Sequence, residues 1–396
     1  MTGDIQHSLA KGNSIALISL DSSAAFDTVD HHLLLKKLHH EFGIAGKPLN
    51  WIKSYLTDRT FSVKVRGAES RKKRLEYGVP QGSLLGPIFY ILYTKPMENI
   101  ARTYGLDIQM YADDTQLYFS FPTNSVGPTE DTLKRCIQAF KTWMNNNYLK
   151  LNDEKTQFTV FDSKSITSLP TQLNLCIANN QIIPPTNKLK ILGITITQNI
   201  NFHTFITNKV RSCVFHLRNF STIRKCLPIS ARITLVTTLI LPQMDYGNAL
   251  LVGATDKDLK PLQRVLNRAI RYIFPMKRNE HITPYLYKLH ILPIRHRINY
   301  KICLLAFKIK STADYLIETF EDFQPTTAIS LRIGPGRDET MFKVFDQIFH
   351  NRSLFCKLVS QWNGLPLPLR KIISLTAFKT RLKTHFFKLA FSEFIT

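Results

Sequence analysis

The sequence lacks the features that mark secreted, membrane-spanning and zinc-binding proteins. Its cysteines form no Cys-x-x-Cys pair and no zinc-type spacing with histidine, so we interpret them as small core residues of a reduced compartment. No apolar run approaches the ~20 residues that cross a bilayer, and no secretory signal follows Met1. We therefore expect a cytoplasmic or nuclear protein. The cysteines are Cys136, Cys176, Cys213, Cys226, Cys303 and Cys356.

Acidic residues are also scarce. The chain has 52 Lys and Arg against 29 Asp and Glu, a formal net charge of +23. Residues 1–197 carry 22 basic and 17 acidic side chains, whereas residues 198–396 carry 30 and 12. A strong positive excess favours a polyanionic partner. Because no long cationic amphipathic helix stands out, we expect nucleic acid rather than an acidic membrane.

What the sequence has in quantity is apolar residues. Hydrophobic residues make up 44% and aromatic residues 11% of the 396 positions, which excludes a disordered chain. This length allows two or three domains with a sizeable core.

Two short apolar segments end in carboxylates. The runs 106–111 and 117–121 flank Asp113 and Asp114, and their aromatic and β-branched residues predict a hairpin with both acids at its tip. The run Ile15–Leu20 predicts a buried strand that ends at Asp21. An isolated Asp-Asp pair is usually a solvated turn. Two acidic strand ends instead suggest one shared metal site, because adjacent like charges are costly without a cation.

Five motifs in order carry a family resemblance, and together they are much more specific than any one alone. The chain resembles the reverse transcriptases of LINE-type, non-LTR retrotransposons, and the resemblance covers nearly all of it. The motifs are Leu20–His31 and Tyr111–Asp114, similar to the two carboxylate motifs, Gly78–Pro87, similar to the template-and-nucleotide motif, and Leu149–Thr156 and Leu192–Ile194, similar to the two that follow.

The resemblance implies an α+β fold. We expect a polymerase palm of antiparallel sheet and packed helices with remnant fingers over residues 1–197, a helical thumb over 198–275 and a mostly helical carboxy-terminal region over 276–396. Only twenty residues precede Asp21, where the resembled family has a long fingers segment, so we expect most of the fingers and any endonuclease domain to be missing. We therefore expect an amino-terminally truncated part of a longer polyprotein.

The resemblance also implies the chemistry, which is two-metal transfer of a nucleotide from a dNTP to a primer 3′-hydroxyl. Asp21 and Asp113 are expected to bridge two Mg²⁺ ions, with Mn²⁺ as an alternative. Asp114 is a weaker candidate, because successive strand residues face opposite ways. Lys155 is expected near the triphosphate, either acting on it or as a plain surface lysine. RNA template and DNA primer, or their duplex, are the implied partners.

The remaining site residues are assigned by resemblance alone. Phe26 would crowd the sugar 2′ position and disfavour ribonucleotides, although a core Phe beside a strand is an alternative. Gln81 and Gly82 would contact the template base or the nucleotide. Leu192 and Gly193 would form the primer grip.

Two other functions stay open. One is a catalytically inactive relic that still binds nucleic acid. The other is a related palm polymerase such as an RNA-dependent RNA polymerase, which Phe26 weighs against.

Periodicity predicts the secondary structure around these motifs. We expect helices at 28–42, with Lys36 and Lys37 outward, at 49–56, with Trp51 and Tyr55 inward, from Gln81 to about Tyr93, and at 129–148, with an apolar stripe from Leu133 to Met144 facing the core. We also expect a turn at 179–180, a strand over 189–196 and a loop over 321–340. Alternation from Phe61 to Arg66 predicts a half-exposed strand. From Phe202 onward we expect helices whose basic residues face phosphates. These residues are Lys209, Arg211, Arg218, Arg224, Lys225, Arg264, Arg268 and Arg271.

Overall fold

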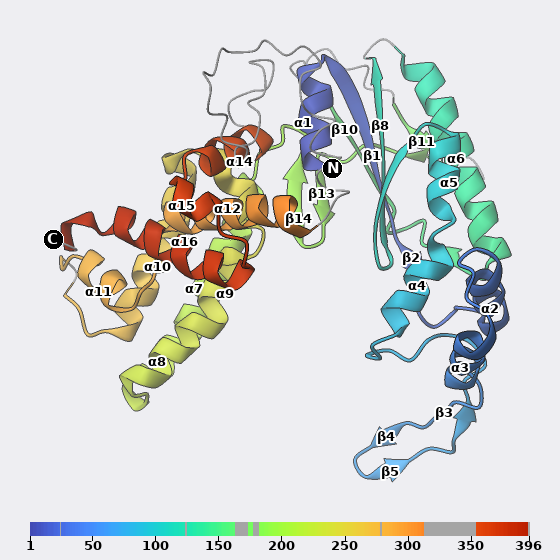
Figure 1. The fold of residues 1–396 in the computed structure, drawn as a ribbon, viewed down its shortest axis with the longest axis horizontal. Helices are drawn as coiled ribbons and strands as arrows, with labels where there is room; N and C mark the ends of the chain where they lie inside the picture. The colour runs from blue at the N-terminus through green and yellow to red at the C-terminus, as the bar shows by residue number, and fades with distance from the viewer. Residues whose placement is uncertain are drawn as a thin grey trace. The chain divides into compact units, whose positions relative to one another are not determined.

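The computed structural model describes residues 1–23, 25–122, 125–162, 173–176, 182–277, 279–312 and 354–394. The chain divides into two compact units (Figure 1). The first unit contains Met1 and Gly12–Leu192, and the second contains Thr2–Lys11 and Gly193–Thr396. The domain boundaries predicted near residues 197 and 275 stay predictions.

A four-stranded antiparallel sheet in the order β10-β1-β8-β7 forms the centre of the first unit. Alternate residues of β1, namely Ala16, Ile18 and Leu20, belong to a core shared with the helices. The predicted α+β class and the buried strand before Asp21 are therefore confirmed. The strands of this sheet are β1 (Asn13–Leu20), β7 (Asp107–Tyr111), β8 (Asp114–Pro122) and β10 (Gln157–Phe161).

The other strands are short. β3 pairs with β6, β4 with β5, β2 with β9 and β11 with β12. The strand predicted over 189–196 is interrupted, because Leu192 and Gly193 both have positive φ and separate β13 from β14. These strands are β2 (Ser22–Ser23), β3 (Thr60–Phe61), β4 (Lys64–Val65), β5 (Ala68–Glu69), β6 (Lys73–Arg74), β9 (Lys150–Leu151), β11 (Leu175–Cys176), β12 (Ile182–Ile183), β13 (Lys188–Ile191) and β14 (Ile194–Thr197).

Helices of the first unit are α2 (His31–His40), α3 (Gly46–Leu56), α4 (Gly86–Thr94), α5 (Met97–Thr103) and α6 (Val126–Asn146). The predicted inward stripe of α6, which runs from Leu133 to Met144, is buried. Two orientations were predicted wrongly. Lys37 of α2 is buried, with its ammonium 5.2 Å and 4.6 Å from the rings of Tyr93 and Trp143. Trp51 of α3 is 57% exposed.

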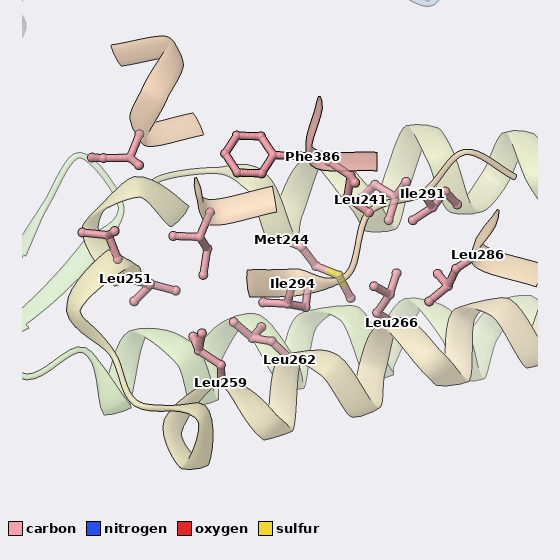
Figure 2. Close-up of a cluster of buried hydrophobic side chains, with 14 of the residues drawn as sticks. Leu241, Met244, Leu251, Leu259, Leu262, Leu266, Leu286, Ile291, Ile294 and Phe386 are labelled. Carbon is pink, nitrogen blue, oxygen red and sulfur yellow. The ribbon is translucent and has the colours of Figure 1, made fainter. Parts of the chain in front are cut away.

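The second unit is built almost entirely of helices. α10 begins at a capping box between Thr255 and Asp258 and buries one apolar face (Figure 2). Leu259, Leu262 and Leu266 on that face belong to the same core as Met244 and Phe386. The α-helices are α1 (Thr2–Ala10), α7 (His203–Ile223), α8 (Ile229–Leu235), α9 (Leu241–Asp245), α10 (Asp256–Ile273), α11 (Thr283–Lys288), α12 (Ile294–Thr312), α14 (Leu354–Asn363), α15 (Leu367–Arg370) and α16 (Leu375–Ala390).

Shorter helical segments complete this unit. A π-helix at Val236–Ile240 lies between α8 and α9, and 3₁₀ turns lie at Arg224–Cys226, Asn248–Gly253 and Ser392–Phe394. No helix in the described part of the chain is long and apolar enough to cross a membrane. A turn predicted at 179–180 and a loop predicted over 321–340 lie outside the described residues.

Candidate active site

The acidic pair lies at the tip of the β7–β8 hairpin. Tyr111 lies opposite Asp114 across the hairpin, so Ala112 and Asp113 form the connecting turn. Ala112 has a φ of 53°, a left-handed conformation that two-residue hairpin turns require and that non-glycine residues seldom adopt. The turn thus holds Asp113 beyond the end of the paired strands, and Asp114 begins β8.

Asp21 lies beside this tip because of the strand register. Leu20, the last residue of β1, is opposite Thr115 of β8, so Asp21 continues alongside Asp114. Burial raises the pKa of the Asp114 carboxyl, and the charges of Asp113 and Asp21 raise it further. Both carboxylates are therefore close enough to Asp114 for like-charge repulsion to act between them.

One oxygen of this group has an unusual environment. Oδ2 of Asp21 is buried and has no hydrogen-bond partner within the described residues. The Lys155 ammonium lies 3.3 Å from it as an ion pair, without hydrogen-bond geometry. The backbone of Asp21 is fixed, because its carbonyl accepts a 2.8 Å hydrogen bond from the Asn152 amide. A buried carboxylate oxygen without a donor is suited to a cation.

The acids fit a divalent metal that shares its ligands with substrate. Among the described residues, no three His, Cys, Asp or Glu side chains gather closely enough to enclose an ion by themselves. Mg²⁺ does not need such a cage, because it keeps several waters and binds through one or two carboxylates together with substrate phosphates. Asp21 and Asp113 offer carboxylates of this kind.

Tyr90 is a residue of this region that the sequence did not single out. It lies on α4 and is buried, and burial raises the pKa of its hydroxyl to about 12. The Ser22 hydroxyl is its hydrogen-bond partner, and the charges of Asp113 and Asp21 both act on it. Its ring packs against the Phe26 ring at 4.8 Å between centroids. In sequence, Tyr90 is one more apolar residue of a helix, so no local signal marks it.

The segment that contains Phe26 is joined to the Gly78–Pro87 motif by backbone hydrogen bonds. The Val79 amide donates to the Phe26 carbonyl at 2.9 Å, and the Gly78 amide donates to the Val29 carbonyl at 2.8 Å. Gly78 has a φ of 85°, and a Cβ there would lie 2.9 Å from Cα of Asp27. Only glycine therefore permits this contact.

Gln81 and Gly82 lie in the loop before α4. The Gln81 side-chain amide donates to Asp27 Oδ1 at 3.0 Å, so one predicted site residue contacts the carboxylate motif. Gly82 has a φ of 78° and open space around it. The helix predicted to open at Gln81 begins only at Gly86, whose amide donates to Ser83 Oγ at 3.0 Å. The loop is longer than predicted because Ser83 forms a turn with Gly86 before the helix starts.

The structure thus brings Asp21, Asp113, Asp114 and Lys155 together and places Phe26 against Tyr90. Leu192 and Gly193 form a separate turn with φ values of 47° and 78°. Leu192 is the last residue of the first unit, and Gly193 belongs to the second. The primer-grip assignment stays a prediction.

The family model and the curated relatives that match this chain all describe RNA-dependent DNA polymerases. Residues 2–196 match the family described as reverse transcriptase (RNA-dependent DNA polymerase). A probable RNA-directed DNA polymerase from transposon BS of Drosophila melanogaster is 26% identical over 264 residues, which are 65% of this chain and 28% of that protein. The RNA-directed DNA polymerase from mobile element jockey of the same fly is 28% identical over 262 residues, which are 64% of this chain and 28% of that protein.

One solved structure with likeness to the chain is an apo telomerase from Candida tropicalis. It has a TM-score of 0.40 and 12% identity, and the match covers 80% of this chain and 55% of that one. The chain spans about 28% of the length of the curated relatives named above.

Proposed function

Since residues 2–196 of this chain belong to the reverse transcriptase family and are homologous to the polymerases of LINE-type retrotransposons, we propose that the chain extends a DNA primer on an RNA template. The observation that carries this proposal is the acidic group at the end of β1 and the β7–β8 turn. Within the described residues only the exposed Lys155 ammonium pairs with the buried Asp21 oxygen, and the like charges of the three carboxylates favour a further cation there. Nucleotidyl transfer is the reaction that such a site supports.

In the proposed reaction, the primer 3′-hydroxyl oxygen bonds to the α-phosphorus of a dNTP, the bond to the β-phosphate oxygen breaks, and pyrophosphate leaves. Asp21 and Asp113 are the residues that would hold two Mg²⁺ or Mn²⁺ ions. When bound, such ions neutralise charge on the attacking and leaving oxygens. Asp114, with its raised pKa, is suited to a weaker or supporting part.

Lys155 and Phe26 would act on the nucleotide. The exposed Lys155 ammonium pairs with Asp21 and can turn on its long side chain to meet the charge of the leaving pyrophosphate. The Phe26 ring would exclude a 2′-hydroxyl by steric contact, and the buried Tyr90 ring beneath it limits how far it can move away. Tyr90 is therefore a positioning residue for Phe26.

Gln81, Gly82, Leu192 and Gly193 would position the two strands. Gln81 is held by Asp27, and Gly82 has no neighbouring atom where its Cβ would be, so a base or sugar can approach the backbone there. The Leu192–Gly193 turn would support the primer end.

Primer extension tests the proposal. A labelled DNA primer on an RNA template is incubated with the full chain, dNTPs and Mg²⁺. We expect Asp113→Asn to lower the extension rate by about 10²–10³-fold, the loss typical when one group that stabilises transition-state charge is removed. Binding of the primer–template should not change.

Asp107→Asn is the matched control, since Asp107 begins β7 at the far end of the same hairpin and is exposed. This variant should extend primers as the wild type does. Binding without extension in the wild type would overturn the proposal in favour of an inactive relic. If Asp113→Asn extends primers at the wild-type rate, Asp113 is not part of the active site.

A further inference from the structure

Helix α3 carries a ladder of stacked side chains on an exposed face. Trp51 is 57% exposed, and its ring stacks on Tyr55 with centroids 5.8 Å apart and an interplanar angle of 18°. The Arg59 guanidinium lies 4.8 Å from the Tyr55 ring, and its Nε donates to the Tyr55 carbonyl at 2.7 Å. Tyr55 also contacts Phe89 of α4, edge to face at 6.0 Å. The ladder is therefore anchored to the core at one end and open to solvent at the Trp51 end.

An exposed arm follows this ladder. Residues 60–74 form a two-stranded hairpin in which β3 pairs with β6 and β4 with β5. Figure 1 shows it projecting beyond the end of α3. Phe61, Val63 and Val65 are all exposed, although their alternation with polar residues had predicted a half-exposed strand with its apolar face covered. A hairpin that buries neither face obtains little stability from the rest of its unit, and its apolar side chains are available to a partner.

The same segment is strongly basic. Residues 47–76 contain nine Lys and Arg and three Asp and Glu. Two of the acids are paired within the arm region, Asp58 with Arg74 at 3.8 Å and Glu69 with Lys64 at 3.2 Å. Within the described residues, no ion pair involves Arg66, Lys72 or Lys73. A partner that neutralises these charges must be anionic.

We propose that α3 and the arm form a binding site for an unpaired nucleic-acid strand. A base stacks on the open face of Trp51, and the lysines and arginines of the arm contact the phosphates on either side of it. Stacking on aromatic rings beside a cationic surface is how proteins bind single strands without sequence preference. A duplex gains only the phosphate contacts, because its bases are already stacked and paired.

This inference deepens the proposed function and rests on it in one respect, namely that the unpaired strand is the RNA template. The binding itself does not depend on catalysis. The test therefore uses the full chain carrying Asp113→Asn, so that a failure of catalysis and a failure of this site give different results.

Tryptophan fluorescence gives a direct reading of base stacking. The chain has three tryptophans, of which Trp362 is buried and Trp143 lies beneath Lys37. Titration with an unstructured oligouridylate should quench the emission of the Asp113→Asn chain. The same chain with Trp51→Phe should show little quenching, because Trp362 is buried and the half-buried Trp143 ring has the Lys37 ammonium over it.

Affinity is measured with a labelled oligouridylate and, separately, with a blunt duplex. Trp51→Ala should weaken oligouridylate binding by about 10-fold or more, since stacking contributes about 1–3 kcal/mol per base. Trp51→Phe, which still stacks, should stay close to wild type. Lys72→Ala with Lys73→Ala should reduce the slope of binding against salt by about 0.7 for each lost phosphate contact.

Leu389→Ala is the matched control, because Leu389 on α16 is also 57% exposed. It should leave both affinities unchanged, and Trp51→Ala should leave duplex affinity unchanged. The inference is overturned if Trp51→Ala binds oligouridylate as tightly as wild type, or if it loses duplex and single-strand binding equally. If binding depends on Trp51 but the wild-type chain never extends primers, this site is supported and only the polymerase proposal is contradicted.

Discussion

Charged side chains have different environments in the two units. In the first unit, the charges of Asp113 and Asp21 raise the pKa of Asp114, and a buried oxygen of Asp21 has no hydrogen-bond donor within the described residues. In the second unit, which belongs to the strongly basic half of the sequence, many arginines are bound internally. Those that donate to backbone carbonyls or pair with carboxylates are Arg224, Arg232, Arg271, Arg295, Arg297 and Arg370.

The difference shows that net charge does not locate a phosphate-binding surface. Arg224 and Arg271 were predicted to face phosphates, but Arg224 donates to the carbonyls that end α10, and Arg271 donates to the Glu280 carbonyl. Lys209, also predicted to face phosphates, is buried and donates to the Gln243 carbonyl. The exposed side chains on α7 and α10, such as Arg211 and Arg264, remain available to a polyanion.

The largest effect that we expect is on the stability of the second unit, and it distinguishes an internally hydrogen-bonded arginine, Arg224, from an exposed one, Arg211. Arg224→Ala removes hydrogen bonds to the carbonyls of Tyr272 at 2.8 Å and Phe274 at 2.9 Å. Hydrogen bonds to charged groups contribute about 1.5–3 kcal/mol each, so two of them give about 3–6 kcal/mol, and we expect the lower end of this range as the fall in the free energy of unfolding because Arg224 is only half-buried. Arg211→Ala should change it by less than about 0.5 kcal/mol. Urea denaturation followed by circular dichroism measures both.

In duplex binding, we expect Arg211→Ala to have the larger effect and Arg224→Ala the smaller one. Arg211→Ala should lower the salt slope of binding by about 0.9 if it contacts one phosphate, whereas Arg224→Ala, measured where it is folded, should keep the wild-type slope. Equal unfolding free energies for the two variants would show that the internal hydrogen bonds of Arg224 contribute nothing, and the comparison would fail.

Sequence reasoning located the elements that have strong periodicity or turn chemistry. β1, the β7–β8 hairpin and the inward face of α6 follow from apolar spacing that extends over many residues. The outward face of α3 could not be found in this way. Trp51 with Tyr55 and Ile52 with Leu56 share the same four-residue spacing, and the structure buries Ile52 and Leu56. A rotation of α3 about its own axis by one residue position decides which of the two pairs faces the core. Only tertiary packing determines that rotation.

Hydrogen-bond and packing partners that are distant in sequence could not be predicted either. Arg224 and the carbonyl of Tyr272 are 48 residues apart, and no local pattern connects them. Phe26 could be assigned by resemblance, but the contact with Tyr90 depends on how α4 packs. The carboxylates could be predicted as a group because each lies at or directly beside a strand end, and strand ends have a defined place in a sheet. The roles of the nine predicted site residues stay predictions.

A smaller effect is expected on the pH dependence of stability, because the aspartates of the first unit repel one another. A raised carboxyl pKa means that native Asp114 binds its proton more tightly than the unfolded chain does. Protonated Asp114 contributes to the free energy of unfolding. This contribution has its full value below the unfolded pKa of about 3.9, and it is lost as the pH rises through the higher native pKa. Asp114→Asn should therefore be more stable than wild type at neutral pH without metal, with a difference that vanishes under acid conditions.

Melting temperatures across this pH range, with a chelator present, measure the effect. Asp131→Asn, at an exposed position of α6, should follow the wild-type curve. Added Mg²⁺ should raise the melting temperature of wild type more than that of Asp114→Asn, since binding to the native state alone stabilises it. Parallel curves for wild type and Asp114→Asn at every pH would mean that the aspartates do not repel one another.

The smallest effect concerns the buried cation of the second unit. Burial lowers the pKa of Lys209 to about 8, although its ammonium donates to the Gln243 carbonyl and lies 4.5 Å from the Phe205 ring. The native state therefore binds this proton less tightly than the unfolded chain, so stability rises with pH between about 8 and 10.5. Lys209→Met lacks this rise. The difference in melting temperature between wild type and this variant should shift in favour of wild type across that interval, whereas Lys225→Met, at an exposed position, should run parallel to wild type. A Lys209→Met curve that also runs parallel would show that the fold stabilises the Lys209 ammonium as well as water does in the unfolded chain, and burial would then not lower its pKa.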